Sequence, residues 1–330
     1  MNLDLQPHVD ELLSWYESNK RPLPWRETKD PYKIWISETM LQQTTSKAVI
    51  PFFERFVSEL PTVEDLASAT QEKVYELWAG LGYYSRARNL QKAARQIVEL
   101  GEFPGSFEEL LPLPGLGPYT ARAVASISFH QPVGVVDGNT IRVFSRLYAQ
   151  KWQWWNQSGR NEIQDIADHW ASFADPAELN QAMMELGASI CRPLNPACLL
   201  CPLAKNCESN LSGRPQDYPE SKPKRAREIW IWNPVVLQDQ GKVLLVKNDS
   251  APFLKNQWLL PGPASMTKKK PQSYDFRHSI THHDIYVTLS TDSSEVDQSG
   301  WTTENALWIR KEKVHSVAPV ALIQKALDLA

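Results

Sequence analysis

Four cysteines are the residues of this 330-residue chain whose type and spacing point most clearly to chemistry. They are its only cysteines, and all lie in one short segment, at Cys191, Cys198, Cys201 and Cys207. Four thiolates this close together can hold a structural zinc ion or an iron–sulfur cluster. Disulfides are less favoured because nothing in the sequence marks secretion. The spacing alone leaves zinc and a cluster as open alternatives.

A second motif contains two glycines, in the segment LPGLG at 113–117. Gly115 and Gly117 in a tight turn would let backbone N–H groups face outward, and a helix beginning at Pro118 would add its positive N-terminal end. Such an arrangement suits a phosphate oxygen and carries no base information. An ordinary turn between two helices is the alternative interpretation.

Two carboxylates are candidates for acid–base chemistry. Glu38 lies in a helical segment, where a lone glutamate is usually a solvated charge. Asp137 directly precedes a helix, which is typical of an N-cap, and the helix end would hold its carboxylate ionised. Paired carboxylates in different environments can divide acid and base roles, as in glycosidic-bond chemistry.

The segments that must position these residues change character near residue 212. Before it, apolar residues recur with helical spacing, which predicts helices at 5–15, 35–46, 70–79, 85–100, 119–129, 139–149 and 161–173. A Pro-, Lys-, Arg- and Ser-rich linker follows at 212–227. Beyond it, we expect strands at 229–237, 242–247 and 284–290, with the first two joined by a hairpin at Asp239-Gln240-Gly241, and a closing helix at 318–329. An all-α body therefore precedes a small α+β domain.

Charge and hydropathy limit the classes of protein to consider. The net charge is −3 and the pI is about 6.2, so any face that binds nucleic acid must be local. No stretch approaches the length of a membrane span, and the N-terminus lacks the features of a signal peptide. We therefore expect a soluble, cytoplasmic protein.

The LPGLG hairpin, the segment VVDGN at 135–139 and the cysteine array occur in that order. In this combination the chain resembles the helix-hairpin-helix, iron–sulfur DNA glycosylase superfamily over residues 20–210. The resemblance implies a 4Fe-4S cluster on the four cysteines rather than zinc. It also implies an iron–sulfur cluster helical domain from 1–27 and 135–211, and a six-helix helix-hairpin-helix domain from 28–134.

Tyr119 separates two chemistries within this superfamily. Members of the endonuclease III type carry a lysine two residues after the second hairpin glycine, and its amine forms a Schiff base that permits strand cleavage. With Tyr119 there, that lyase step is not available. The segments SETMLQQT at 37–44 and GLGYYSRARNL at 80–90 instead resemble the adenine DNA glycosylase (MutY) family.

This second resemblance implies an activity. The enzyme would be a monofunctional glycosylase of base excision repair that hydrolyses the N-glycosidic bond of adenine opposite 8-oxoguanine, and also opposite guanine. Its partner would be double-stranded DNA, and it would act as a monomer, associated with the bacterial nucleoid through DNA. The alternatives are a bifunctional, oxidised-pyrimidine glycosylase of the endonuclease III type and a non-catalytic mismatch-binding module.

The resemblance further implies roles for individual residues. Adenine would be flipped from the duplex. Glu38, protonated because of burial, would protonate the adenine and later help activate water, whereas ionised Asp137 would stabilise the oxocarbenium-like sugar. Tyr119 and Asn139 would position that carboxylate and the sugar. The residues expected to line the adenine pocket are Trp25, Arg26, Leu41 and Glu185.

Other residues are expected to contact the rest of the DNA. Gln43 and Tyr83 would wedge into the base stack, with Tyr84 buried in the core. Arg86 and Arg88 would contact phosphates.

The last part of the chain, 228–330, is expected to be a Nudix-like domain that recognises 8-oxoguanine. Thr281 and His282 match the hydroxyl and the imidazole of the Phe-Ser-His loop of the family, while Ile280 lacks the aromatic ring. The domain has no glutamate-rich Nudix box, so we expect no nucleotide pyrophosphatase activity.

Overall fold

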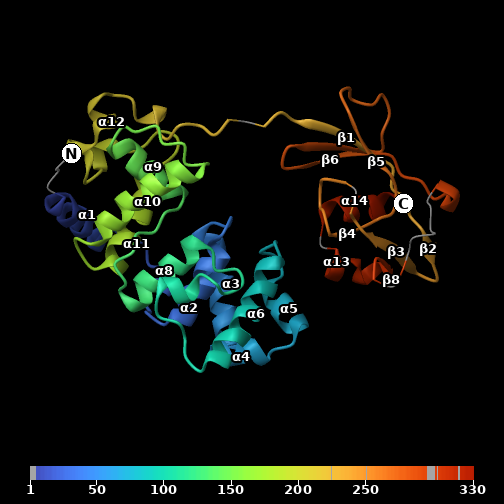
Figure 1. Ribbon diagram of the computed structural model, residues 1–330, viewed down its shortest axis with the longest axis horizontal. Helices are drawn as coiled ribbons and strands as arrows, with labels where there is room; N and C mark the ends of the chain where they lie inside the picture. Colours follow the sequence, from blue (N-terminus) through green and yellow to red (C-terminus); the bar gives the residue numbers. More distant parts are fainter. Residues whose placement is uncertain (1–4, 224, 250, 296–301, 303, 319) are drawn as a thin grey trace. The chain divides into compact units, whose positions relative to one another are not determined.

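The computed structural model describes all residues except 1–4, 224, 250, 296–301, 303 and 319 (Figure 1). The chain divides into two compact units, Met1–Lys222 and Pro223–Ala330. No helix within the described part of the chain is long and apolar enough to cross a membrane.

Unit 1 is helical (Figure 1). Its α-helices are α1 (Gln6–Asn19), α2 (Pro31–Leu41), α3 (Ser46–Glu59), α4 (Val63–Ser68), α5 (Gln71–Trp78), α6 (Ser85–Leu100), α7 (Phe107–Leu110), α8 (Pro118–Phe129), α9 (Gly138–Leu147), α10 (Gln157–Ala171), α11 (Pro176–Ser189) and α12 (Glu208–Leu211). Short 3-10 turns lie at η1 (Pro24–Arg26), η2 (Cys198–Leu200), η3 (Ala204–Asn206) and η4 (Pro215–Asp217).

Two hydrophobic cores stabilise unit 1. One is built mainly by α2 to α8 around large buried side chains such as Trp35, Phe56 and Trp78. The other joins α1 with α9, α10 and α11 around Phe144 and Trp170. Because α8 packs against both α2 and α11, it connects the two cores.

Several helix boundaries differ from the sequence expectation. The helix expected at 35–46 begins earlier, at Pro31, because Asp30 accepts a hydrogen bond from the Tyr32 N–H and proline favours a first turn. It ends at Leu41, since Gln43 has φ of 62°, outside helical geometry. Helices α4, α7, α11 and α12, and all but the first residue of α3, lie outside the segments predicted to be helical.

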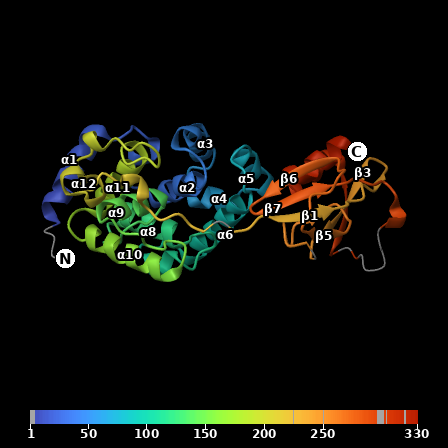
Figure 2. The same ribbon diagram turned by 90° about the horizontal axis from the view of Figure 1, so that it is seen from above.

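The described residues of unit 2 form two four-stranded sheets. Its strands are β1 (Glu228–Trp232), β2 (Gln238–Asp239), β3 (Lys242–Lys247), β4 (Trp258–Leu259), β5 (Ala264–Thr267), β6 (Phe276–Ile280), β7 (His283–Val287) and β8 (Ala306–Arg310). One sheet has the order β5-β1-β7-β6, with β1 and β7 parallel (Figure 2). The other has β2-β3-β4, and β8 pairs with β3.

Helices and apolar side chains complete unit 2. The helices are α13 (Val314–Val317) and α14 (Ala321–Leu329). Trp232 and Phe253 are buried in its core together with Leu322 and Ile323 of α14. The expected α+β architecture is therefore present, and the Nudix-like identity of this unit stays a prediction.

The hairpin expected between 229–237 and 242–247 is wrong in one respect. Gln240-Gly241 does turn the chain, but it joins β3 to the two-residue strand β2. The long first run ends at Trp232, and β1 pairs with β5 and β7 instead. Asn233-Pro234 interrupts the run, because proline has no N–H to continue a ladder.

The segment expected to be a linker is partly bound to unit 1. Arg146 Nε donates a hydrogen bond to the Tyr218 carbonyl at 3.0 Å, and Trp154 Nε1 donates to the Glu220 carbonyl at 2.9 Å. These contacts hold the chain on unit 1 as far as Glu220.

Candidate active site

A cavity of about 370 Å³ lies between the two cores of unit 1. Its wall contains eight residues that the sequence singled out: the four expected catalytic residues Glu38, Tyr119, Asp137 and Asn139, and the four expected pocket residues Trp25, Arg26, Leu41 and Glu185. They come from η1, α2, α8, α9 and α11, so the cavity depends on the packing of segments far apart in sequence.

Glu38 lies on the buried face of α2, and its residue is 4% exposed. The Tyr119 hydroxyl donates a hydrogen bond to Glu38 Oε2 at 2.6 Å. Burial is the main cause that raises the pKa of Glu38, the hydrogen bond from Tyr119 and the charge of Arg26 lower it, and the charge of Asp137 raises it, with a net pKa of about 7. Glu38 is therefore poised to gain or lose a proton near neutral pH.

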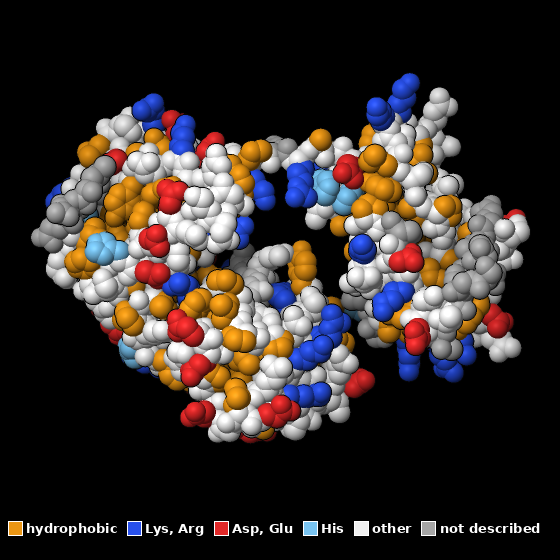
Figure 3. Space-filling model, viewed as in Figure 1, with side chains coloured by type: hydrophobic (Ala, Val, Ile, Leu, Met, Phe, Trp, Pro, Cys, Tyr) orange, Lys and Arg blue, Asp and Glu red, His pale blue; other side chains and the backbone are white. Residues whose placement is uncertain are grey.

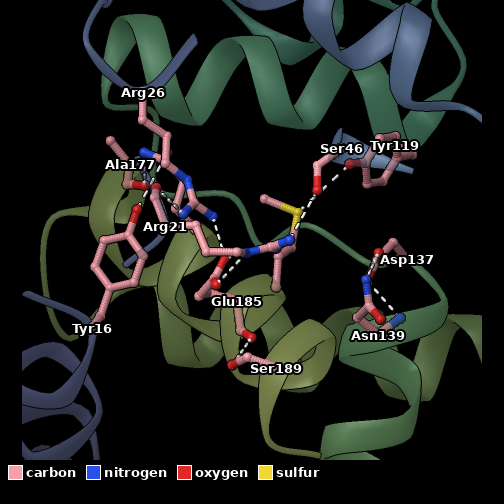
Figure 4. Close-up of polar contacts among 12 residues, drawn as sticks. Tyr16, Arg21, Arg26, Ser46, Tyr119, Asp137, Asn139, Ala177, Glu185 and Ser189 are labelled. Carbon is pink, nitrogen blue, oxygen red and sulfur yellow. Dashed lines mark hydrogen bonds and ion pairs between the residues drawn. The ribbon is translucent and has the colours of Figure 1, made fainter. Parts of the chain in front are cut away.

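Asp137 is the N-cap of α9, as its position in the sequence predicted. Its Oδ1 accepts hydrogen bonds from the backbone N–H groups of Asn139 and Thr140, at 2.9 and 2.8 Å. Its Oδ2 accepts one from Asn139 Nδ2 at 2.9 Å (Figure 4). These three donors suit a charged carboxylate that faces the cavity.

Asn139 is held in turn by a residue that the sequence did not single out. Arg142 donates a hydrogen bond to Asn139 Oδ1 at 2.9 Å and another to the Gly187 carbonyl at 2.7 Å. The bond to Oδ1 fixes the Asn139 amide, so that its NH₂ group faces Asp137. Arg142 follows Asp137 by five residues on the same helix, which is the only signal the sequence offers.

Glu185 is buried and ionically paired at another wall of the cavity. Arg21 donates to both of its carboxylate oxygens, at 2.6 and 2.9 Å, and Arg26 donates to Oε2 at 2.7 Å (Figure 4). Burial acts to raise the pKa of Glu185, but these two arginines outweigh burial and hold it below its usual value. Arg21 was not predicted, although the segment Arg21-Pro22-Leu23-Pro24-Trp25-Arg26 places it near Arg26.

The two expected wedge residues do not line this cavity. Gln43 and Tyr83 are exposed, and both have positive φ, at 62° and 48°. Tyr83 is 63% exposed, whereas Tyr84 packs against the Tyr75 ring. This exposure suits the expected roles, which stay predictions.

Arg86 requires a correction. Its guanidinium is turned inward and donates to the carbonyls of Thr39 and Gln42, at 2.8 and 2.7 Å, and of Leu81 at 3.0 Å. It therefore joins the end of α2 to the turn before Tyr83, and these bonds leave its terminal nitrogens committed to the protein rather than to a phosphate. Arg88 is exposed. Lys and Arg side chains gather over α5 and α6 (Figure 3).

The two hairpin glycines differ in whether their backbone conformation and surroundings require glycine. Gly115 has φ of 84°, and an added Cβ would lie 2.9 Å from Asn89 Cβ, so the position requires glycine. Gly117 is the N-cap of α8, with φ of −75° and open space where a Cβ would point. The helix begins at Pro118 as predicted.

The four cysteines surround a small pocket and are free thiols. Arg146 lies beside them, with Nη1 3.4 Å from Cys191 Sγ, and it also donates to the carbonyls of Arg192 and Pro193. Four sulfur donors beside a cation fit a site whose metal-bound thiolates carry negative charge.

Thr281 and His282 belong to unit 2, where Thr281 has φ of 53° in the turn between β6 and β7.

Comparison with known proteins relates the helical part of the chain to a superfamily. Residues 36–171 match the HhH-GPD superfamily base excision DNA repair protein family. A solved structure of a thermostable thymine-DNA glycosylase is 27% identical, covers 62% of this chain and 95% of its own, and aligns with a TM-score of 0.57. The helical fold of unit 1 is thus that of the HhH-GPD superfamily.

Curated relatives identify the family within this superfamily. An adenine DNA glycosylase of Buchnera aphidicola subsp. Schizaphis graminum is 30% identical over 339 residues, which cover 96% of this chain and 97% of that one. The chain belongs to the adenine DNA glycosylase family, which confirms the resemblance of its motifs. An adenine DNA glycosylase of Rattus norvegicus is 45% identical over 210 residues, 60% of this chain. This match spans about two fifths of the rat protein, 41% of its length.

Proposed function

We propose that the chain is a monofunctional glycosylase that removes adenine opposite 8-oxoguanine, and opposite guanine, by hydrolysis of the N-glycosidic bond. The observation that carries this proposal is the Tyr119 hydroxyl, 2.6 Å from Glu38 in the cavity that also contains Asp137. A lyase would need an amine at the position of Tyr119. The adenine DNA glycosylase relatives support the same reaction.

In the proposed mechanism, Glu38 is the general acid. With a pKa of about 7, a large fraction of Glu38 carries a proton at neutral pH. It gives this proton to an imidazole-ring nitrogen of the flipped adenine, which makes the base a better leaving group. Tyr119 keeps the carboxyl oriented toward the cavity.

Asp137 acts on the sugar. As the C1′–N bond breaks, positive charge develops on the sugar ring, and the nearby carboxylate stabilises it. Asn139 and the first N–H groups of α9 hold that carboxylate in place. Water then adds at C1′ and loses a proton to Glu38, so adenine and an abasic sugar are the products.

The remaining surfaces bind double-stranded DNA. The Gly115–Gly117 hairpin and exposed Arg88 contact phosphates, while Gln43 and Tyr83 wedge into the stack beside the lesion. Unit 2 is a Nudix-like lesion reader, whose exposed turn offers Thr281 and His282. The enzyme acts as a monomer on DNA in the bacterial cytoplasm.

The four cysteines bind a 4Fe-4S cluster. The four cysteines would hold the cluster and so crosslink the Pro-rich loop 192–205, whose Leu194, Leu199 and Leu200 side chains are exposed and add little burial of their own. Arg146, already tied to the carbonyls of Arg192 and Pro193, orients that loop and offsets the negative charge of the thiolates.

Product analysis tests the proposal. A duplex with one adenine opposite 8-oxoguanine is incubated with the protein, and the products are separated with and without hot alkali. Strand cleavage only after alkali is expected, because the base is lost without lyase chemistry. Cleavage without alkali would show that another amine acts as nucleophile. Tight binding without any base release would instead favour the mismatch-binding module, and Asp137→Asn, which should bind but not excise, is the matched control.

A further inference from the structure

Glu228, His282 and His283 lie together where β1 and β7 begin in unit 2. One nitrogen from each imidazole and one carboxylate oxygen lie within 4.8 Å of one another. We propose that these three side chains bind a divalent transition metal ion of the zinc type. The proposal does not depend on the proposed glycosylase activity.

The backbone sets the three side chains beside one another. β1 and β7 pair in parallel, with Glu228 opposite His283, and the Glu228 N–H donates to the His282 carbonyl at 2.9 Å. The tight turn at Thr281 brings the two imidazole rings to a centroid separation of 4.0 Å. Because sheet pairing holds these positions, the site is largely formed before an ion binds.

The separations fit metal ligands better than hydrogen-bonded partners. His282 Nε2 lies 3.6 Å from Glu228 Oε1, and His283 Nε2 lies 3.4 Å from Glu228 Oε2. N–H···O hydrogen bonds measure about 2.7–3.2 Å. Two ligands of a tetrahedral zinc ion with bonds of about 2.0–2.1 Å stand about 3.3–3.4 Å apart. Small side-chain rotations would therefore close the site on an ion.

Outer contacts orient two of the ligands. Trp230 Nε1 donates a hydrogen bond to Glu228 Oε2 at 3.0 Å, and the Thr281 hydroxyl lies 3.3 Å from His282 Nδ1. Ligands of metal sites are commonly held by such partners. With Nδ1 beside the Thr281 hydroxyl, the His282 Nε2 atom is left to face Glu228.

The donor set selects the class of ion. Two imidazoles and one carboxylate suit zinc and its neighbours, whereas magnesium and calcium prefer oxygen ligands alone. The Glu228 side chain is 37% exposed and that of His283 8%, so one side of the site is open to solvent and can admit a water ligand.

Zinc titration of the full chain tests the site. The protein, with its iron retained, is first freed of loosely bound metal and then titrated with zinc by calorimetry. Zinc and iron are measured in the same sample, so that any zinc bound at the cysteines in place of iron is counted separately. We expect one additional zinc ion per chain. Glu228→Gln should lower the affinity by about tenfold or more, and His283→Ala should abolish binding.

The variants must be compared as folded proteins. Glu228→Gln is near-isosteric and still accepts the Trp230 hydrogen bond, and its thermal midpoint without zinc should match that of the unaltered protein. His315→Ala removes an exposed histidine of α13, outside the cluster, and should leave zinc binding unchanged. The proposal would be overturned if the unaltered chain failed to bind the additional zinc. It would also be overturned if Glu228→Gln and His283→Ala both bound zinc as tightly as the unaltered chain.

Discussion

Gly187 of α11 lies so close to Asn139 of α9 that a Cβ atom added to the glycine would be 2.5 Å from the Asn139 Cβ. Contacts between real Cβ atoms essentially never fall below 3.0 Å. The close approach lets Arg142 reach both the Gly187 carbonyl and Asn139 Oδ1. Two helices from distant parts of the chain thus hold the amide that bonds to Asp137.

The first prediction concerns this contact. Gly187→Ala should push Asn139 away from Asp137 and lower the single-turnover rate of adenine excision by about a hundredfold, because small displacements of a catalytic group are costly. Binding to an abasic-site duplex should change much less. Gly138→Ala is the matched control, since a Cβ there points into open space. Equal rates for Gly187→Ala and Gly138→Ala would contradict the positioning role.

The second prediction concerns the pH dependence of excision. The reaction needs Glu38 protonated, and its pKa is about 7, so the rate should fall as the pH rises above 7. Tyr119→Phe removes a hydrogen bond that lowers this pKa, so the alkaline limb should move to higher pH. The measurement is single-turnover excision from pH 5.5 to 9 for both proteins. An unchanged alkaline limb in Tyr119→Phe would contradict the assignment of that limb to Glu38.

The third prediction links Glu38 to stability. Its pKa rises from 4.5 to about 7 on folding, so the folded state binds the proton more tightly. The free energy of unfolding should therefore decrease as the pH rises from 4.5 to 7, by about 3 kcal/mol at most. Glu38→Gln removes this titration, so its thermal midpoint should exceed that of the unaltered protein at pH 8 and not at pH 5. If the thermal midpoints of Glu38→Gln and the unaltered protein changed with pH in parallel, the link between Glu38 and stability would be refuted.

The fourth prediction separates the two arginines of α6. Arg88→Ala should reduce the slope of log K against log salt for duplex binding by about one, as expected for one lost phosphate contact. Arg86→Ala should leave the slope unchanged but lower the thermal midpoint, because it leaves the carbonyls at the end of α2 without their donor. If Arg86→Ala also reduces the slope, its inward assignment is wrong.

The fifth prediction separates the hairpin glycines. Gly115→Ala should destabilise the protein by about 1–2 kcal/mol, because φ is 84° and Asn89 blocks the new methyl group. Gly117→Ala has ordinary φ and open space, so it should keep its stability and weaken duplex binding by obstructing the phosphate. Thermal melts and binding titrations of both variants check this. Equal melting points would contradict the difference in strain.

Local features of this chain could be predicted from its sequence. The span of α6, the N-cap at Asp137, the helix start at Pro118 and the clustered cysteines all depend on neighbours a few residues away. Helix capping, turn geometry and hydrophobic periodicity depend only on residues close together in the chain, so they can be read from a single sequence. The order of the motifs also indicated the family.

Only the tertiary structure decided properties that depend on distant residues. The pKa of Glu38 follows from burial and from Tyr119, 81 residues away, and the pairing of Glu185 follows from Arg21, 164 residues away. The inward turn of Arg86 depends on carbonyls of another helix, and the partners of β1 depend on the return of the chain at β5 and β7. Desolvation and long-range pairing arise from packing, and local sequence patterns do not specify them.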